Sequence, residues 1–68
     1  MIVVIKNITA ETLEIEAFLF KIGIQECKVN KDTYILEKAT EEQYEKLVKF
    51  STELGEKDKV IFVKKNGL

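Results

Sequence analysis

Four short runs with strand composition alternate with two longer stretches of helix composition, and this order limits the chain to few folds. The strand-like runs cover residues 2–5, 24–29, 33–36 and 60–63. The helix-like stretches, 9–22 and 40–54, contain no breaker, and each is followed by a glycine, Gly23 or Gly55, where helices commonly end. The expected order is therefore strand, helix, strand, strand, helix, strand.

Capping side chains stand at the start of both predicted helices. Thr9 is the expected N-cap of the first helix. Thr40 begins the sequence Thr-Glu-Glu-Gln, which is a capping box: its hydroxyl accepts from the Gln43 N–H while the Gln43 side chain bonds back. Between the second and third strands, residues 30–32 (Asn-Lys-Asp) have turn composition and predict a hairpin.

Two right-handed strand-helix-strand crossovers joined by a hairpin produce one architecture. It is an α+β, ferredoxin-like βαββαβ fold, in which a four-stranded antiparallel sheet carries two helices on one face. The first and third strands are expected in the centre of the sheet. No linker, repeat or low-complexity stretch divides the sequence, so we expect residues 1–68 to form a single domain.

The small size of the chain makes additional stabilisation important, because such a domain buries only about 60% of the surface of its unfolded state. Cys27 is the only cysteine and histidine is absent, which excludes an internal disulfide and leaves no cluster with metal-ligand spacing. We therefore expect no metal and no cofactor, and a second protein chain is the remaining source of stabilisation. The 11 basic residues are balanced by 12 acidic ones, which disfavours a polyanion-binding protein.

The apolar run at residues 1–5 is too short for the core of a signal peptide. No stretch approaches the roughly 20 apolar residues of a membrane span. Together with the single unpaired cysteine, these features favour a cytoplasmic protein. The high lysine and glutamate content, without histidine or proline, suits a thermostable one.

Three of the four predicted strands are apolar on both faces, although helices are expected to cover only one. Side chains alternate along a strand, so Ile2 and Val4 lie on one face of the first strand and Val3 and Ile5 on the other. The third and fourth strands repeat this pattern, and the alternation leaves open which set faces outward. The strand residues that we predict to contact a partner chain are Ile2, Val4, Tyr34, Leu36, Val60 and Phe62.

The first predicted helix carries two apolar stripes. The stripe with core-facing spacing consists of Ile15, Phe18, Leu19 and Ile22. The second stripe lies nearly opposite and consists of Leu13, Ala17 and Phe20. The sequence is compatible both with a loop or terminus covering the second stripe and with a docking surface there, so Leu13 and Phe20 join the predicted interface residues.

No pattern of residues indicates catalysis. The glutamates are spread over helix surfaces, and the three glycines form no phosphate-binding loop. Cys27 has no histidine to activate it, so we predict a buried structural cysteine. Tyr34 lies on the strand where RNA-recognition folds place stacking aromatics, but their flanking residues are missing, and we predict a core or interface tyrosine. We therefore predict no catalytic, cofactor-binding or metal-binding residue.

Two protein families share short motifs with the chain. Residues 3–9 (Val-Val-Ile-Lys-Asn-Ile-Thr), 34–37 (Tyr-Ile-Leu-Glu) and 58–62 (Asp-Lys-Val-Ile-Phe) resemble the small ferredoxin-fold subunit of CRISPR adaptation complexes. This resemblance implies a homodimer associated with nucleic acid, and Asn7, where that family has an acidic residue, implies one without nuclease activity. Residues 19–24 are similar to ACT domains, which implies a small-molecule-sensing regulatory domain.

The surplus apolar positions favour a non-enzymatic protein-interaction module. We expect it to self-associate through the open face of the sheet, most simply as a homodimer with a two-fold axis, or to dock another protein there. The alternatives are the two functions that the resemblances imply, a nucleic-acid-associated dimer and a ligand-sensing domain.

Overall fold

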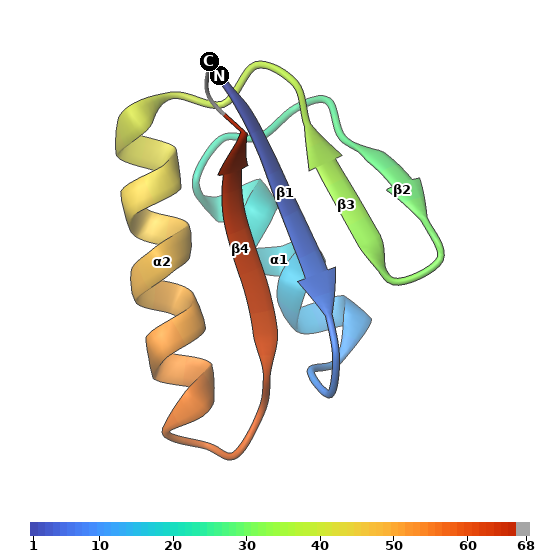
Figure 1. Cartoon of the computed structure of the whole chain (residues 1–68), viewed down its shortest axis with the longest axis vertical. Helices are drawn as coiled ribbons and strands as arrows, with labels where there is room; N and C mark the ends of the chain where they lie inside the picture. The colour runs from blue at the N-terminus through green and yellow to red at the C-terminus, as the bar shows by residue number, and fades with distance from the viewer. Residues whose placement is uncertain (67–68) are drawn as a thin grey trace.

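The computed structural model describes residues 1–66 and contains six elements in the predicted order (Figure 1). They are β1 (Ile2–Asn7), α1 (Thr12–Lys21), β2 (Lys28–Asn30), β3 (Thr33–Leu36), α2 (Glu41–Gly55) and β4 (Ile61–Asn66). The strands form one antiparallel sheet in the order β2-β3-β1-β4, so β1 and β3 are central as predicted. This order and topology confirm the ferredoxin-like α+β fold.

The core lies between the sheet and the two helices. In Figure 1, α1 passes behind the sheet and α2 runs alongside β4. The buried side chains come from every element except β2, and they are Val3, Ile5, Ile15, Leu19, Tyr34, Leu36, Ala39, Leu47, Leu54 and Ile61. Phe18 of α1 and Phe50 of α2 stack with their ring centroids 4.0 Å apart, which joins the helices to each other as well as to the sheet.

The start of α2 agrees with the sequence prediction. The Thr40 hydroxyl accepts from the Gln43 N–H at 3.1 Å, and the Gln43 side chain accepts from the Thr40 N–H at 2.9 Å, which completes the capping box. At the other end, Gly55 is the last helical residue instead of the residue that follows the helix. Asp58, with a φ of 60°, takes the left-handed conformation in the turn that leads to β4.

The start of α1 differs from the prediction, because the helix begins at Thr12 and not after Thr9. The Thr9 hydroxyl does not cap the helix; it accepts from the Val60 N–H at 2.7 Å. The Asn7 side chain bonds both the N–H and the carbonyl of Ala10 at 2.8 Å, which stabilises a turn at residues 7–10. These residues connect β1 to the entry of β4, so they are not available to the helix.

The end of α1 at Gly23 agrees with the prediction. Gly23 has a φ of +87°, a conformation that favours glycine. Its N–H donates to the Phe20 carbonyl at 3.1 Å, and the Ile24 N–H donates to the Leu19 carbonyl at 2.9 Å. These are the two hydrogen bonds of a Schellman motif, which satisfies carbonyls that the last turn of a helix leaves without partners.

The strands next to α1 and α2 differ in length from the prediction. β2 comprises only Lys28–Asn30 instead of residues 24–29. Ile24 is held at the end of α1 by its backbone hydrogen bond and packs against the core, so residues 24–27 leave the sheet. β4 continues to Asn66, beyond the predicted end at residue 63, because its pairing with β1 extends until Ile2 lies opposite Asn66.

Candidate interaction surface

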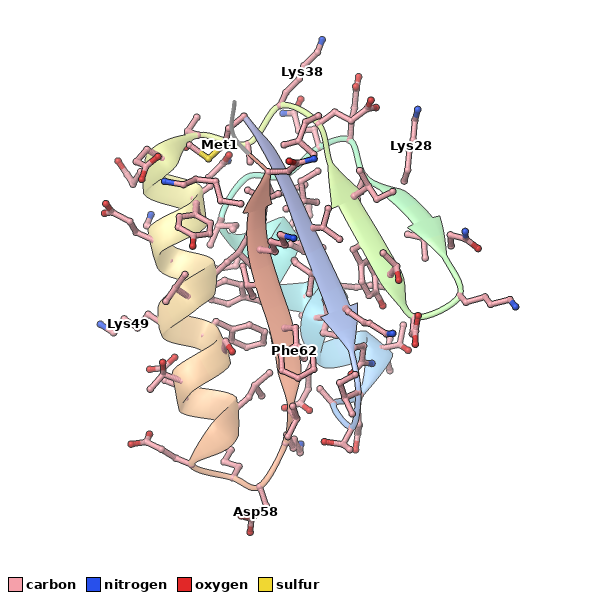
Figure 2. All side chains as sticks on the ribbon, in the orientation of Figure 1. Met1, Lys28, Lys38, Lys49, Asp58 and Phe62 are labelled. Carbon is pink, nitrogen blue, oxygen red and sulfur yellow. The ribbon has the colours of Figure 1, made fainter. Side chains whose placement is uncertain are left out.

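The face of the sheet opposite the helices carries a block of apolar side chains. The register places Val4 between Ile35 of β3 and Lys64 of β4, and it places Lys6 beside Phe62. Phe62 retains 61% of its surface in solvent and lies on the side of the sheet turned toward the viewer (Figure 2). We define the open-face patch as Ile2, Val4, Ile35 and Phe62.

Tyr34 and Leu36 do not belong to this patch, contrary to the sequence prediction. They lie opposite Ile5 and Val3 of β1, which point into the core. Directly opposed residues share a face of the sheet, so Tyr34 and Leu36 point toward the helices, and each is at most 2% exposed. Ile35, which lies between them, takes the outward position that was predicted for its neighbours.

Val60 is one of the predicted interface residues, and its side chain is exposed, so it is accessible to a partner. It lies where the chain enters β4, two residues before Phe62. Its carbonyl accepts from the N–H groups of Ile8 and Thr9, both at 3.0 Å. The backbone at this end of the open face is therefore held in place, while the side chain of Val60 stays accessible.

Lysines surround the open-face patch. Ile35 and Val4 are neighbours in one cross-strand row. Lys28, on the edge strand β2, lies at one end of this row, and Lys64, on the edge strand β4, lies at the other. Lys6 lies in the next row, beside Phe62. No residue of the strands contributes a carboxylate to this face within the part of the chain that is described. Glu37, the residue after β3, offsets the charge of Lys28 at a distance of 3.3 Å, so the positive charge around the apolar centre of the open face comes from Lys6 and Lys64.

A second apolar surface lies on the outer side of α1. Leu13 is 75% exposed and Phe20 is 85% exposed, and Ala17 lies between them on the same stripe. Within residues 1–66, no loop or terminus covers this stripe, although the sequence left that arrangement open. Val29 of β2 is 58% exposed and faces Phe20 across a hollow of about 160 Å³. We define the α1 patch as Leu13, Ala17, Phe20 and Val29.

The α1 patch could only partly be predicted from sequence. Leu13 and Phe20 follow from their helical spacing. Val29 was not among the predicted interface residues; it is exposed on β2, which is short and lies at the edge of the sheet. The residues that line the hollow are Glu16, Leu19, Phe20, Ile24, Cys27, Val29 and Tyr34.

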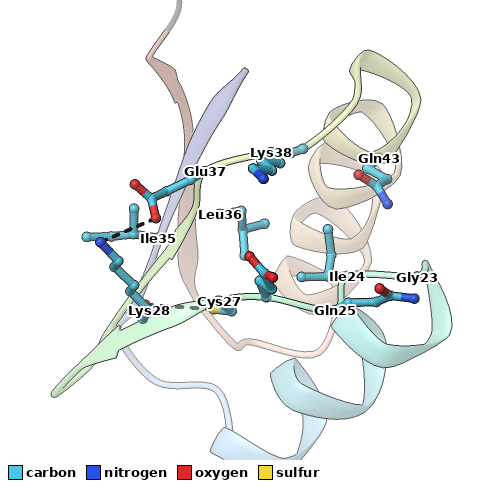
Figure 3. A pocket seen from close by; sticks show the side chains of 12 residues that line it. Gly23, Ile24, Gln25, Cys27, Lys28, Ile35, Leu36, Glu37, Lys38 and Gln43 are labelled. Carbon is cyan, nitrogen blue, oxygen red and sulfur yellow. Dashed lines mark hydrogen bonds and ion pairs between the residues drawn. The ribbon is translucent and has the colours of Figure 1, made fainter.

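A groove of about 780 Å³ opens where residues 24–27 leave β3 (Figure 3). Residues 23–28 form one wall, residues 35–39 form the other, and Gln43 lies at one end. Lys28 and Glu37 reach toward each other across it, with Nζ and Oε1 3.3 Å apart. Both side chains are more than half exposed, so the groove presents solvated charges of both signs and not a dry, enclosed site.

Cys27 lines this groove and the hollow, and it is half-buried in a loop instead of fully buried on a strand as predicted. Burial raises the pKa of the Cys27 thiol, and the nearby Glu16 carboxylate acts in the same direction. A higher pKa reduces the fraction of thiolate, which is the nucleophilic form. Cys27 is therefore poorly suited to act as a nucleophile.

Residues 1–66 show no metal-binding group and no membrane-spanning helix. They contain no group of three or more histidine, cysteine, aspartate or glutamate side chains that can hold a metal ion. None of their helices is long and apolar enough to cross a membrane. No protein-family model, curated protein or solved structure matches the chain. The fold and surfaces define a small α+β domain with two exposed apolar patches.

Proposed function

We propose that the chain is a non-enzymatic protein-interaction module that self-associates through the open face of its sheet. The observation that carries this proposal is the open-face patch. Val4 and Ile35 lie side by side on β1 and β3, Phe62 of β4 lies diagonally from Val4, and neither helix covers them. Scattered exposed apolar residues are ordinary, but a contiguous patch on a small protein usually marks a contact site.

The arrangement of side chains on the open face supports the same proposal. Val4 and Ile35 form the centre, and Lys28 and Lys64 lie at the two edges of the sheet. Protein interfaces commonly have an apolar centre and a polar rim. The lysine side chains can cover apolar surface with their methylene groups while their ammonium groups stay in water.

The size of the face sets the expected strength of association. The molecule measures 30 × 22 × 22 Å, so its largest face is about 660 Å² in projection. A stable interface typically buries about 800 Å² per partner. Covering a few hundred Å² of apolar surface contributes several kcal/mol at about 25 cal/mol per Å², before the cost of association. We therefore expect weak, concentration-dependent association.

Light scattering after size-exclusion chromatography, across a wide range of protein concentration, tests the proposal. The mass is expected to rise with concentration, and Phe62→Glu is expected to abolish the rise. Val48→Glu is the matched control, because Val48 is an exposed apolar residue on α2, outside both patches. Circular dichroism verifies that both variants are folded. A wild-type chain that stays monomeric at every concentration refutes the proposal.

Single-stranded nucleic acid is a second candidate partner, favoured by one feature of the same face. Phe62 lies directly beside Lys6, with Lys64 two residues further along β4. Exposed aromatic side chains stack on bases, and lysines neutralise phosphates. Fluorescence anisotropy with a labelled oligonucleotide tests this candidate: binding should weaken as salt rises and should be lost in Phe62→Ala. Absence of binding at low salt rejects it.

A further inference from the structure

We infer that the self-association is head-to-tail: the open face of one chain packs against the α1 patch of the next. The inference rests on the proposed function, since it names the surface that the open face meets. The chain has two exposed apolar patches, and a two-fold contact between open faces covers only one of them. A single kind of head-to-tail contact covers both.

The two patches lie on opposite sides of the molecule. α1 packs Ile15 and Leu19 against the sheet, so Leu13 lies on the side of the helix away from the sheet, and Phe20 borders the hollow beside Val29 on the helix side of the molecule. The open face points in the other direction. The two patches of one chain therefore cannot contact each other, but those of two copies can. Each added copy leaves one patch of each kind free, so the contact repeats and forms a ring or a filament.

Charge favours contact between unlike surfaces. The open face presents Lys6 and Lys64, while the charge of Lys28 is offset by Glu37 at 3.3 Å. α1 has two glutamates and one lysine, and Glu14 is already paired with Lys59 at 2.6 Å. Glu16 borders the hollow beside Phe20. A two-fold contact brings lysines toward lysines, whereas a head-to-tail contact brings them toward Glu16.

The inferred contact has the geometry of a helix on a sheet. The inner face of the same sheet already packs in this way, and helix-on-sheet layering is a common solution for burying one apolar face. α1 has 10 residues and is thus about 15 Å long, which fits within the 22 Å width of the molecule. Phe20 and Phe62 supply one large aromatic side chain to each surface, a residue type that often dominates binding energy.

Two variants distinguish the inferred arrangement from a two-fold dimer. Phe62→Glu damages the open face and leaves the α1 patch intact, and Phe20→Glu does the reverse. Head-to-tail association predicts that each variant alone is a monomer by light scattering. An equimolar mixture should form a dimer that cannot grow, because both of its outer surfaces are damaged. The wild-type chain and Val48→Glu should exceed the mass of a dimer as concentration rises.

The other outcomes are equally specific. If Phe20→Glu assembles like the wild-type chain and Phe62→Glu joins none of its assemblies in the mixture, the inference fails but self-association through the open face stands. If the wild-type chain is monomeric at every concentration, the proposed function fails with it. If circular dichroism shows that Phe62→Glu or Phe20→Glu is unfolded, Ile2→Glu and Leu13→Glu replace them, with the same expectations.

Salt provides an independent readout on the unmodified chain. Screening weakens attraction between lysines and glutamates, so a head-to-tail assembly should dissociate as ionic strength rises. A two-fold contact between lysine-bearing faces should instead strengthen, because screening reduces repulsion. An average mass that increases with salt would therefore contradict the inference.

Discussion

The side-chain amide of Gln43 connects the two helices, and replacing it with a carboxylate tests what that connection contributes. Its Oε1 accepts from the Thr40 N–H at 2.9 Å, and its Nε2 donates to the Ile22 carbonyl at the end of α1 at 3.0 Å. Glutamate serves equally well in a capping box, and its charge suits the start of a helix. Considered within α2 alone, Gln43→Glu should be neutral or stabilising.

The contact with α1 predicts the opposite. A carboxylate cannot donate to the Ile22 carbonyl, so the variant loses a partly buried hydrogen bond with a net contribution of about 1 kcal/mol. It also places one acceptor against another, which costs about 1–3 kcal/mol, while the helix dipole returns at most about 1 kcal/mol. We expect a net destabilisation of about 1–3 kcal/mol, with each kcal/mol lowering Tm by roughly 4–8 °C.

Urea unfolding followed by circular dichroism measures this difference between Gln43→Glu and the wild-type chain. At about pH 7 the new carboxyl is ionised and the full deficit should appear; at about pH 3 it is protonated and can donate to the Ile22 carbonyl. The deficit should therefore shrink as pH falls. Gln43→Ala, which loses both contacts, gives the comparison at both pH values. A variant as stable as wild type at pH 7, or a deficit that grows on acidification, would refute this reasoning.

Three further predictions concern single positions. Gly23→Ala should lower the free energy of unfolding by about 1–2 kcal/mol, because Gly23 has a φ of +87°. Gly55→Ala should raise it by about 0.5–1 kcal/mol, because Gly55 is helical and has open space around it. Equal shifts of the two variants in urea unfolding would contradict this. The hydrogen bond from Lys59 lowers the pKa of Glu14 below its ordinary value of 4.5. The ion pair should therefore stabilise the folded chain above pH 4.5, and this stabilisation should be lost as pH falls through the lowered pKa of Glu14. Glu14→Gln should remove it, so a difference in unfolding free energy between Glu14→Gln and wild type that does not depend on pH argues against this prediction. Burial raises the pKa of Cys27, so iodoacetamide at about pH 8 should label it more slowly than free cysteine, and equal rates would contradict a shielded thiol.

The fold was predictable where the signals are local. The order of elements, the capping box at Thr40 and the stop at Gly23 each depend on a few neighbouring residues. The start of α1 was not, because the Thr9 hydroxyl bonds the N–H of Val60, 51 residues away, in place of its own helix. The length of β2 was overestimated for a similar reason, since Ile24 forms a hydrogen bond at the end of α1 and packs against the core instead of joining the strand.

The open face shows how a periodic pattern can be correct while its phase is wrong. The sequence predicts that strand 3 carries apolar residues on both faces, but it does not state which set is outward. A usable signal was present: Thr33, the polar residue of β3, shares a face with Ile35 and marks that face as exposed. Lys6 marks the face of Ile2 and Val4 in the same way, and there the predicted residues do lie on the open face.

The inner side of α1 contributes to the free energy of folding, and its outer side contributes to the free energy of association. Association can therefore be measured separately from folding. A ten-residue helix is too short to be stable alone, so α1 depends on burial of residues such as Ile15 and Leu19, where truncation to alanine costs about 2–5 kcal/mol. Leu13 and Phe20 are mostly in water, and changing them should alter monomer stability by no more than about 0.5 kcal/mol. Association that buries them stabilises only the folded chain, so Tm should rise with protein concentration. Phe20→Glu should remove this rise and leave the Tm of dilute protein unchanged; a Tm that falls equally at all concentrations would place Phe20 in the core of the monomer instead of at a contact between chains.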